Sequence, residues 1–261
     1  MSAPGFDSAL FERECATREL TLGRPLSWRD ETQSSNDDAL AAAKSGAPHG
    51  AVFGAETQTR GRGRRGSEWV SAPGAGLWFS VLLRPKLSAE LVSGLSLCAG
   101  LAVRSAVAQR VAAPVLVKWP NDVLVSGRKL CGILVESQVT GANIGSVVVG
   151  IGVNVTQSAF PEPLASIATS LALLGASTTT REALLADVLQ GLERELLRLS
   201  EHGLAGMAAT LRAHDPLLGR RLRVDSLEGT GAGIDSAGRL LLQSDDGQQH
   251  PINAGHVELL D

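Results

Sequence analysis

The sequence contains only three cysteines, Cys15, Cys98 and Cys131, too few and too widely spaced for a disulfide framework or a zinc knuckle. We therefore expect reduced and mostly structural cysteines. The five histidines show no metal-ligand spacing, which argues against a transition-metal site. Aromatic residues make up only 3% of the chain, fewer than an RNA-binding protein with aromatics between its basic residues would have.

Long apolar runs are also missing. The longest nearly apolar stretch, residues 95–103, ends at Arg104 and is far shorter than the ~20 residues that cross a bilayer. Residues 1–14 lack the basic region and apolar run of a secretory signal. We therefore expect a cytoplasmic protein without membrane contact. The net charge of −3 argues against a general nucleic-acid binder.

What is present is typical of a globular protein. With 261 residues, 44% of them hydrophobic, the chain is long enough for one sizeable domain and one small domain. The pattern changes near Pro216 to short strands separated by turn residues. We therefore expect a larger domain over residues 1–216 and a small β-barrel over residues 217–261.

Hydrophobic periodicity predicts the main elements. Apolar runs bounded by glycine and proline predict strands at residues 51–56, 77–83, 115–119, 130–137 and 146–155. Helices are predicted at residues 37–44, capped by Ser35 or Asn36, and from Ser88 to about residue 111. A third helix is predicted after Thr179, which would form a capping box with Glu182, and its core face would consist of Leu185, Val188, Leu189, Leu192, Leu196 and Leu199. Further strands are predicted at residues 221–224, 231–234, 239–243, 250–252 and 256–259.

The most unusual segment is Gly61-Arg62-Gly63-Arg64-Arg65-Gly66. Glycine lets the backbone form a concave set of N–H groups, and the guanidinium groups bind carboxylate or phosphate oxygens in pairs. A basic tail or a solvated loop is the alternative, but the segment lies between two predicted strands. A Walker-type loop is excluded because no Gly-Lys-Ser/Thr follows. The pattern favours an anion site.

A second segment, Lys118-Trp119-Pro120-Asn121-Asp122, directly follows an apolar strand. A lysine held at the end of a buried strand stabilises a developing negative charge, unless its side chain simply extends to solvent. Asn121 and Asp122 either orient a ligand or magnesium, or form the turn.

Three further features carry polar groups or glycines. Glycines interrupt the strands that contain Gly132 and Gly150-Ile151-Gly152, which indicates either a ligand against the backbone or close packing. Asn154 is a polar group in an apolar run and needs hydrogen-bond partners if it is buried, a nucleotide among the candidates. Ser34, Ser35 and Asn36 offer groups suited to a polar heterocycle, or a plain helix cap.

Taken in order, Ser-Ser-Asn, Gln-Thr-Arg-Gly-Arg-Gly-Arg-Arg-Gly, Lys-Trp-Pro-Asn-Asp, Arg-Lys-Leu-Cys-Gly-Ile-Leu-Val-Glu and Gly-Ile-Gly-Val-Asn-Val resemble the biotin protein ligase family, over about residues 27–260. The resemblance implies an α+β fold with a mixed, largely antiparallel sheet flanked by helices, as in class II aminoacyl-tRNA synthetases, and a small C-terminal SH3-like barrel. It implies biotin and ATP as substrates, with Mg²⁺, and formation of biotinyl-5'-AMP.

The same resemblance implies site residues. The biotin site would consist of Ser34, Ser35, Asn36, Gln58, Gly61, Arg62, Gly63, Arg64, Lys118 and Gly132. The ATP and adenylate site would consist of Arg62, Arg64, Arg65, Trp69, Lys118, Asn121 and Asn154. The catalytic roles would fall to Lys118, at the biotin carboxylate and phosphate, and to Arg64, which retains the adenylate. No protein metal ligand is assigned.

Two positions depart from the family pattern: Ser35 stands where threonine is usual and keeps the hydroxyl, and Arg60 adds a charge before the loop. The resemblance implies a biotin carboxyl carrier protein as acceptor and a monomer or weak homodimer. Some relatives carry an N-terminal DNA-binding domain, but only about 25 residues precede the matched region here, so we expect no nucleic-acid partner. Lipoate-protein ligases, which share the fold but lack this loop, are the nearest alternative.

Overall fold

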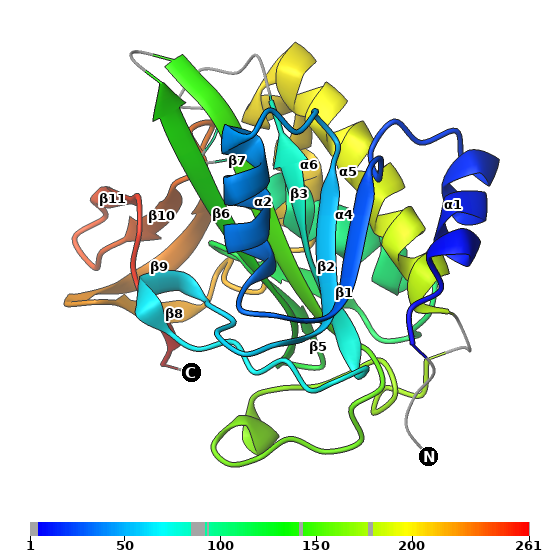
Figure 1. Cartoon of the computed structure of the whole chain (residues 1–261). Helices are drawn as coiled ribbons and strands as arrows, with labels where there is room; N and C mark the ends of the chain where they lie inside the picture. Colours follow the sequence, from blue (N-terminus) through cyan, green and yellow to red (C-terminus); the bar gives the residue numbers. More distant parts are fainter. Residues whose placement is uncertain (1–4, 85–91, 93, 141–142, 177–179, 261) are drawn as a thin grey trace.

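The computed structural model describes residues 5–84, 92, 94–140, 143–176 and 180–260. Seven strands form the main sheet in the order β1-β2-β3-β7-β6-β5-β4 (Figure 1). They are β1 (Leu26–Thr32), β2 (Val52–Gln58), β3 (Gly76–Leu83), β4 (Val115–Lys118), β5 (Asp122–Val125), β6 (Arg128–Thr140) and β7 (Asn143–Asn154). Only β1 and β2 pair in parallel, and all other neighbours are antiparallel. The predicted mixed, largely antiparallel sheet is confirmed.

Helices cover both faces of this sheet (Figure 1). On one face, α2 (Ser35–Lys44) packs against β2, β3 and β7. On the other face lie α4 (Leu95–Ala108) and α5 (Arg181–His202), with α1 (Ser8–Thr17) packed on α5 and α6 (Ala208–Ala213) after it. Short 3-10 turns occur at η1 (Arg64–Gly66), η2 (Leu164–Ser166) and η3 (Leu204–Met207).

Burial follows from this layering. Every residue of β3 is buried, because this interior strand is covered by α2 on one face and by α5 on the other. The helix α4 is buried on most of its surface, since it lies between the sheet and α5. The helices α4 and α5 approach closely at Gly191, where a Cβ would lie 3.0 Å from Cα of Ala102. The predicted leucine and valine face of α5 is buried in the core, Leu196 partly so.

Five short antiparallel strands form the C-terminal sheet in the order β11-β10-β9-β8-β12. They are β8 (Arg221–Val224), β9 (Leu227–Ile234), β10 (Leu240–Gln243), β11 (Gln249–Ile252) and β12 (Val257–Leu259). The predicted strands are therefore present, but the predicted barrel is not closed, because β11 and β12 do not pair with each other within the described part of the chain. Two features explain the open edge: β12 is only three residues long, and Pro251 in β11 has no N–H to donate.

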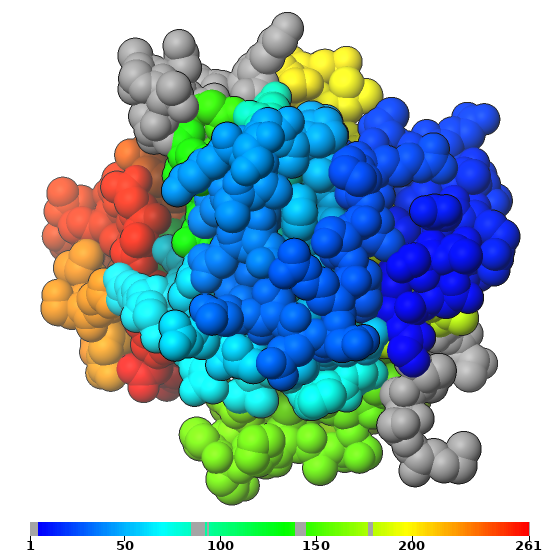
Figure 2. All heavy atoms as spheres, in the orientation of Figure 1, coloured from blue at the N-terminus to red at the C-terminus, as the bar shows by residue number. Residues whose placement is uncertain are grey.

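The C-terminal sheet rests against the larger part of the molecule (Figure 2). The Trp119 indole Nε1 donates to the Gly238 carbonyl at 2.9 Å, and Arg65 pairs with Asp225 at 3.1 Å. None of the described helices is long and apolar enough to span a membrane. All three cysteines are free and buried, as predicted.

Two element predictions need correction. Neither Ser35 nor Asn36 caps α2, because their side chains bond instead to Ser80 and Glu136. The N-cap residue is Ser34, and its side chain makes no capping bond. The predicted cap residue Thr179, like Ser88, lies outside the described residues, and the N-terminus of α5 is instead capped by Thr180, whose hydroxyl accepts from the Ala183 N–H at 3.1 Å. Glu182 is therefore one position too early for a capping box and accepts from the Asp7 N–H.

The sequence analysis did not predict β1, β5, the helices α1 and α6, or the short 3-10 turns. The strand β1 is exposed or half-buried at all positions but the last, as expected for a polar edge strand without an alternating pattern. The strand β5 has four residues, directly after the turn at Pro120. The helix α1 buries only Phe11 and Cys15, which is too few apolar residues for a clear periodic signal.

Candidate functional site

A cavity of about 720 Å³ collects nearly all the predicted site residues. Its walls come from the start of α2, the arginine-glycine loop (residues 61–66), β6, β7, the turn between β4 and β5, and residues 255–257, which lead into β12. The predicted residues that line it are Ser34, Ser35, Asn36, Gln58, Arg62, Gly63, Arg64, Arg65, Trp69, Lys118, Asn121, Gly132 and Asn154. Of the predicted set, Gly61 alone does not line the cavity.

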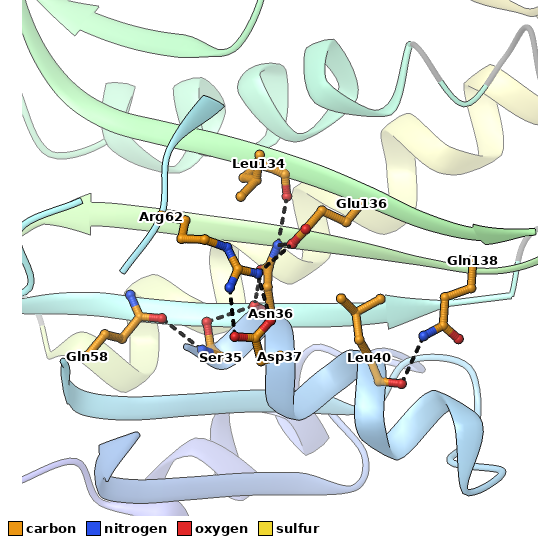
Figure 3. Close-up of polar contacts among 10 residues, drawn as sticks. Ser35, Asn36, Asp37, Leu40, Gln58, Arg62, Leu134, Glu136 and Gln138 are labelled. Carbon is orange, nitrogen blue, oxygen red and sulfur yellow. Dashed lines mark hydrogen bonds and ion pairs between the residues drawn. The ribbon is translucent and has the colours of Figure 1, made fainter. Parts of the chain in front are cut away.

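One wall holds a polar cluster, defined by Ser35, Asn36, Gln58 and Ser80. The Ser35 N–H donates to Gln58 Oε1 at 2.8 Å (Figure 3). The Ser80 hydroxyl donates to Asn36 Oδ1 at 2.5 Å and lies 2.8 Å from the Ser35 hydroxyl. Because Ser80 has one hydroxyl hydrogen, Ser35 must donate to Ser80. The Ser35 oxygen then keeps lone pairs that can accept an N–H from a ligand.

A glycine floor, defined by Gly132, Gly150 and Gly152, continues from this cluster. The strand registers place Gly150 opposite Ser80 of β3, and Gly152 opposite Gly132 of β6. The Trp69 ring covers Gly132 and Gly152, since a Cβ at either position would lie 2.7 Å or less from it. The prediction left open whether these glycines serve packing or a ligand, and the structure shows that they make room for Trp69 and Asn36 beside the cavity.

The arginine-glycine loop folds back on itself as a tight hairpin. The Gly63 N–H donates to the Ser67 carbonyl at 2.7 Å, and the Trp69 N–H donates to the Gly61 carbonyl at 2.9 Å. A Cβ at Gly61 would lie 2.5 Å from the Trp69 carbonyl oxygen, so this base position requires glycine. Gly61 thus shapes the loop from outside the cavity. Arg65 adopts a left-handed conformation with φ of 54°.

The three arginines of the loop have different surroundings. Arg62 makes a bidentate ion pair with Asp37, with both N–O distances 2.7 Å, and this partner raises the pKa of Arg62. Arg65 pairs with Asp225 of the C-terminal sheet at 3.1 Å. The Arg64 guanidinium has no hydrogen-bond or ion-pair partner in the described ranges, and burial lowers its pKa. Arg64 is therefore the loop arginine that is free to bind an anion in the cavity.

Two lysines bring further positive charge. The Lys118 ammonium donates to the Val257 carbonyl at 3.2 Å, and burial lowers the pKa of Lys118. The Lys129 ammonium lies 2.7 Å from Asp122 Oδ1 and 5.4 Å from the centroid of the Trp69 ring. Both lysines line the cavity.

The sequence analysis missed Lys129. Strict alternation along β6 would put Lys129 and Gly132 on opposite faces of the sheet. The register of β5 and β6 shifts by one residue between Lys129 and Cys131, and this bulge brings the Lys129 side chain over Gly132. The basic pair Arg128-Lys129 ahead of the glycine was the available signal.

Two predicted amides are bound within the protein. The Asn121 Nδ2 group donates to the Ile133 carbonyl at 2.8 Å and braces the turn after β4. Asn154 donates to the Thr169 carbonyl at 2.9 Å and accepts from Gln157 Nε2 at 3.2 Å. Both residues reach the cavity wall, but these amides position backbone rather than project freely into the cavity.

An apolar wall, which the sequence did not reveal, closes another side of the cavity. It comes from the segment between β7 and α5, and its lining residues are Ala159, Phe160, Pro161, Leu164, Ile167 and Ala168. The segment is hydrogen-bonded to β6: the Lys129 N–H donates to the Ile167 carbonyl at 2.8 Å, and the Thr169 N–H donates to the Lys129 carbonyl at 2.9 Å. Ile167 remains 57% exposed, which suits a surface that covers a ligand.

Comparison with known proteins first defines the class. Residues 30–154 match the Biotin/lipoate A/B protein ligase family, and residues 219–260 match the Biotin protein ligase C terminal domain. The structure of a biotin protein ligase from Aquifex aeolicus in complex with biotin and ATP superposes with a TM-score of 0.76 and 29% identity, covering 90% of this chain and 98% of that one.

Two curated relatives match nearly the whole chain. A biotin–[acetyl-CoA-carboxylase] ligase of Mycobacterium tuberculosis is 37% identical over 259 residues, 94% of this chain and 94% of the relative. A bifunctional ligase/repressor of Bacillus subtilis is 33% identical over 244 residues, 91% of this chain and 75% of the relative. The chain therefore belongs to the biotin protein ligase family. The resemblance predicted from the motifs is confirmed.

Proposed function

We propose that this cavity converts biotin and ATP into biotinyl-5'-AMP and that the biotinyl group then passes to a lysine of a biotin carboxyl carrier protein. The chain is an ATP-dependent biotin ligase, and the lipoate ligase alternative is not favoured. One observation carries the assignment of roles within the site: a polar cluster and three cations, Arg64, Lys118 and Lys129, line the same cavity.

The polar cluster suits the ureido ring of biotin. A ureido group has two N–H donors and a carbonyl acceptor, so it needs both kinds of partner. The Ser35 oxygen keeps lone pairs for an N–H, and Ser34 and Gln58 lie beside it on the cavity wall. We assign the biotin head to this cluster.

The Trp69 ring, which lies on the glycine floor and lines the cavity, suits the aliphatic chain of biotin. Ser80 of β3 pairs with Gly150 of β7. Two residues further along β7, Gly152 pairs with Gly132 of β6, which in turn pairs with Asp122 of β5. Trp69 and Asn36 fill the space over these glycines, so a chain that starts at the polar cluster and runs along the cavity side of the Trp69 ring reaches Lys129, which lies over Gly132. The biotin carboxylate would thus arrive beside the cations.

Three cations can then share the negative charge of the carboxylate and the α-phosphate. The charge is largest as the carboxylate oxygen attacks phosphorus, so preorganised ammonium and guanidinium groups favour that transition state. Lys118 and Arg64 keep the catalytic roles that the resemblance implies, and Lys129 joins them on geometric grounds. Arg62 and Arg65 pair with Asp37 and Asp225, which do not line the cavity, so we assign these arginines to holding the loop. Lys129 also has a carboxylate partner, but that partner, Asp122, lies in the cavity wall, so the Lys129 charge stays at the site.

The nucleotide would lie toward the apolar wall. Phe160 and Ile167 offer surface for an adenine ring, while Asn121 and Asn154 hold the surrounding backbone in place. In the described ranges no group of three or more His, Cys, Asp or Glu side chains is arranged to hold a metal ion. A magnesium ion, which neutralises ATP phosphates, would therefore rely mainly on phosphate and water oxygens, and the carboxylates that line the cavity are those of Glu68 and Asp122.

The reaction balances without a side-chain nucleophile. A biotin carboxylate oxygen forms a bond to the α-phosphorus, and the bond to pyrophosphate breaks. The neutral amine of the acceptor lysine then attacks the acyl carbon, loses a proton and releases AMP. The chain's residues orient the reactants, balance charge and, through the loop and Trp69, exclude water from the adenylate.

The proposal extends to the domains, the oligomeric state and the acceptor of the ligase. We propose that residues 1–216 form the catalytic domain and residues 217–261 the C-terminal domain, supported by the family match over residues 219–260. We also propose that the protein is a monomer or weak homodimer, that it has no nucleic-acid partner and that it is cytoplasmic. The carrier protein is proposed because the relative of Mycobacterium tuberculosis is named for acetyl-CoA carboxylase.

A direct test combines binding and transfer. Calorimetry should detect biotin binding, and ATP should then drive biotin onto a purified biotin-carboxyl-carrier domain, with mass spectrometry reporting a single biotinylated lysine. Lipoate added in excess should not compete, and omission of ATP should abolish transfer. Transfer of lipoate in place of biotin would overturn the proposal.

A further inference from the structure

A single carboxylate oxygen joins the cavity to the arginine-glycine loop. Oε2 of Glu136 accepts from Asn36 Nδ2 at 2.6 Å and lies 3.4 Å from Nη2 of Arg62 (Figure 3). Asn36 belongs to the polar cluster, whereas Arg62 belongs to the loop. Glu136 of β6 therefore contacts both at once.

The contact extends into a continuous hydrogen-bonded path. Ser80 donates to Asn36, Asn36 donates to Glu136, Arg62 donates to the same Glu136 oxygen, and Arg62 also donates to both oxygens of Asp37. Asp37 lies next to Asn36 in the first turn of α2. The loop is thus attached through Arg62 to α2, which carries Ser35 and Asn36 of the polar cluster, and to β6, which carries Glu136.

Asn36 has little freedom to rearrange within this path. It is 4% exposed, and its Oδ1 atom lies so close to Gly150 that a Cβ there would be 2.1 Å away. A ligand that binds the polar cluster must therefore adjust to this amide or shift it against Glu136. Any shift of the Glu136 carboxylate changes its distance to Arg62.

The ion pairs of Arg62 are exposed. The side chains of Arg62, Asp37 and Glu136 are 38%, 47% and 32% exposed. Ion pairs this open to solvent contribute little to global stability. We expect these ion pairs to affect the position of the loop rather than folding, because opening the loop costs far less free energy than unfolding the chain.

We infer that Glu136 is a positioning residue that couples occupancy of the polar cluster to closure of the arginine-glycine loop, by holding Asn36 and Arg62 with one carboxylate oxygen. The inference rests on the proposed function, in which the polar cluster binds the biotin head. Glu136 itself touches no reacting atom.

Glu136→Gln separates the two contacts. The amide oxygen of glutamine still accepts from Asn36 Nδ2, but the neutral side chain loses the ion pair with Arg62. Asp37→Asn is the companion variant, since it weakens the other partner of Arg62. Asp245→Asn is the matched control, because it removes an exposed arginine–carboxylate pair, with Arg221, in the C-terminal sheet.

Trypsin provides a direct measure of loop opening, because the loop contains three arginines and cleavage requires an open backbone. In the wild-type chain, biotin should slow cleavage within residues 61–66. In Glu136→Gln and Asp37→Asn, cleavage with biotin present should be faster by roughly two- to fivefold, the factor an exposed ion pair contributes. Asp245→Asn should behave as wild type, and all thermal unfolding midpoints should agree.

A steady-state measurement distinguishes coupling from a structural role. Glu136→Gln should raise KM for biotin by a similar factor and leave kcat for adenylate formation nearly unchanged, because the closed loop retains its catalytic groups. Wild-type cleavage and KM in Glu136→Gln would overturn the inference, as would a lowered unfolding midpoint that accounts for the faster cleavage. Absence of adenylate formation by the wild-type chain would instead overturn the proposed function.

Discussion

The Asn36 side chain fills the space that a side chain at position 150 would need, and Gly150 leaves that space open. A Cβ built on Gly150 would lie 2.1 Å from Oδ1 of Asn36, well inside contact distance. The Asn36 oxygen in turn accepts from Ser80, which lies opposite Gly150 in the pairing of β3 and β7. Glycine at position 150 therefore allows Asn36, and with it the polar cluster, to lie against β7.

We predict that Gly150→Ala weakens biotin binding. The added methyl group must displace Asn36, and overpacking of this kind costs about 1 to 3 kcal/mol, most of it expressed here as misplacement of the cluster. Calorimetric titration with biotin checks the loss. Gly5→Ala is a matched control because a Cβ there meets nothing within 4 Å. Unchanged affinity in a folded Gly150→Ala variant would remove the polar cluster from the biotin site.

We predict that Arg64→Gly releases biotinyl-5'-AMP. Arg64 is the unpaired guanidinium of the loop, so its removal takes away a cation from the cavity without breaking an ion pair. Released adenylate acylates bystander lysines. These biotinylated lysines can be counted by mass spectrometry on an added protein that is not a biotin acceptor. Arg60→Gly serves as control, because Arg60 is exposed and does not line the cavity. Equal retention by both variants would contradict the role of Arg64.

We predict that Lys118→Ala and Lys129→Ala each slow adenylation. If each ammonium acts as a single electrostatic donor at the transition state, its loss costs roughly 2 to 4 kcal/mol. Pyrophosphate release in single-turnover experiments measures this step without the transfer step. Lys44→Ala, at the exposed end of α2, should leave the rate unchanged. A wild-type rate in either cavity variant would exclude that lysine from the catalytic group.

We predict that adenylation declines at a lower alkaline pH than an ordinary lysine would give. Burial lowers the pKa of Lys118 below its usual 10.5, so as pH rises the ammonium loses its proton, and its charge, earlier. The negative charge of Asp122 acts in the opposite direction. Asp122→Asn should therefore shift the alkaline limb of the pH–rate profile further toward neutral pH. A shift in the opposite direction would show that Lys118 does not control this limb.

Much of the site could be predicted from the sequence because its motifs are local. The arginine-glycine loop, the lysine after β4 and the serine-serine-asparagine triplet are each contiguous, so residue type and order alone identified them. Lys129 was missed because a β-bulge, which no simple alternation reveals, changes the face on which its side chain lies. The apolar wall around Phe160 and Ile167 was missed because an irregular segment has no periodicity.

The sequence by itself determined the family, the layered α+β fold and most of the residues that line the cavity, since periodic apolar residues and contiguous motifs encode these features locally. Only the tertiary structure decided which charges are available. Arg62, Arg64 and Arg65 look equivalent in the sequence, yet Asp37 and Asp225, from two distant parts of the chain, bind the outer two. Arg64 is left free because long-range contacts, rather than its own neighbours in sequence, set the electrostatic surroundings of each guanidinium.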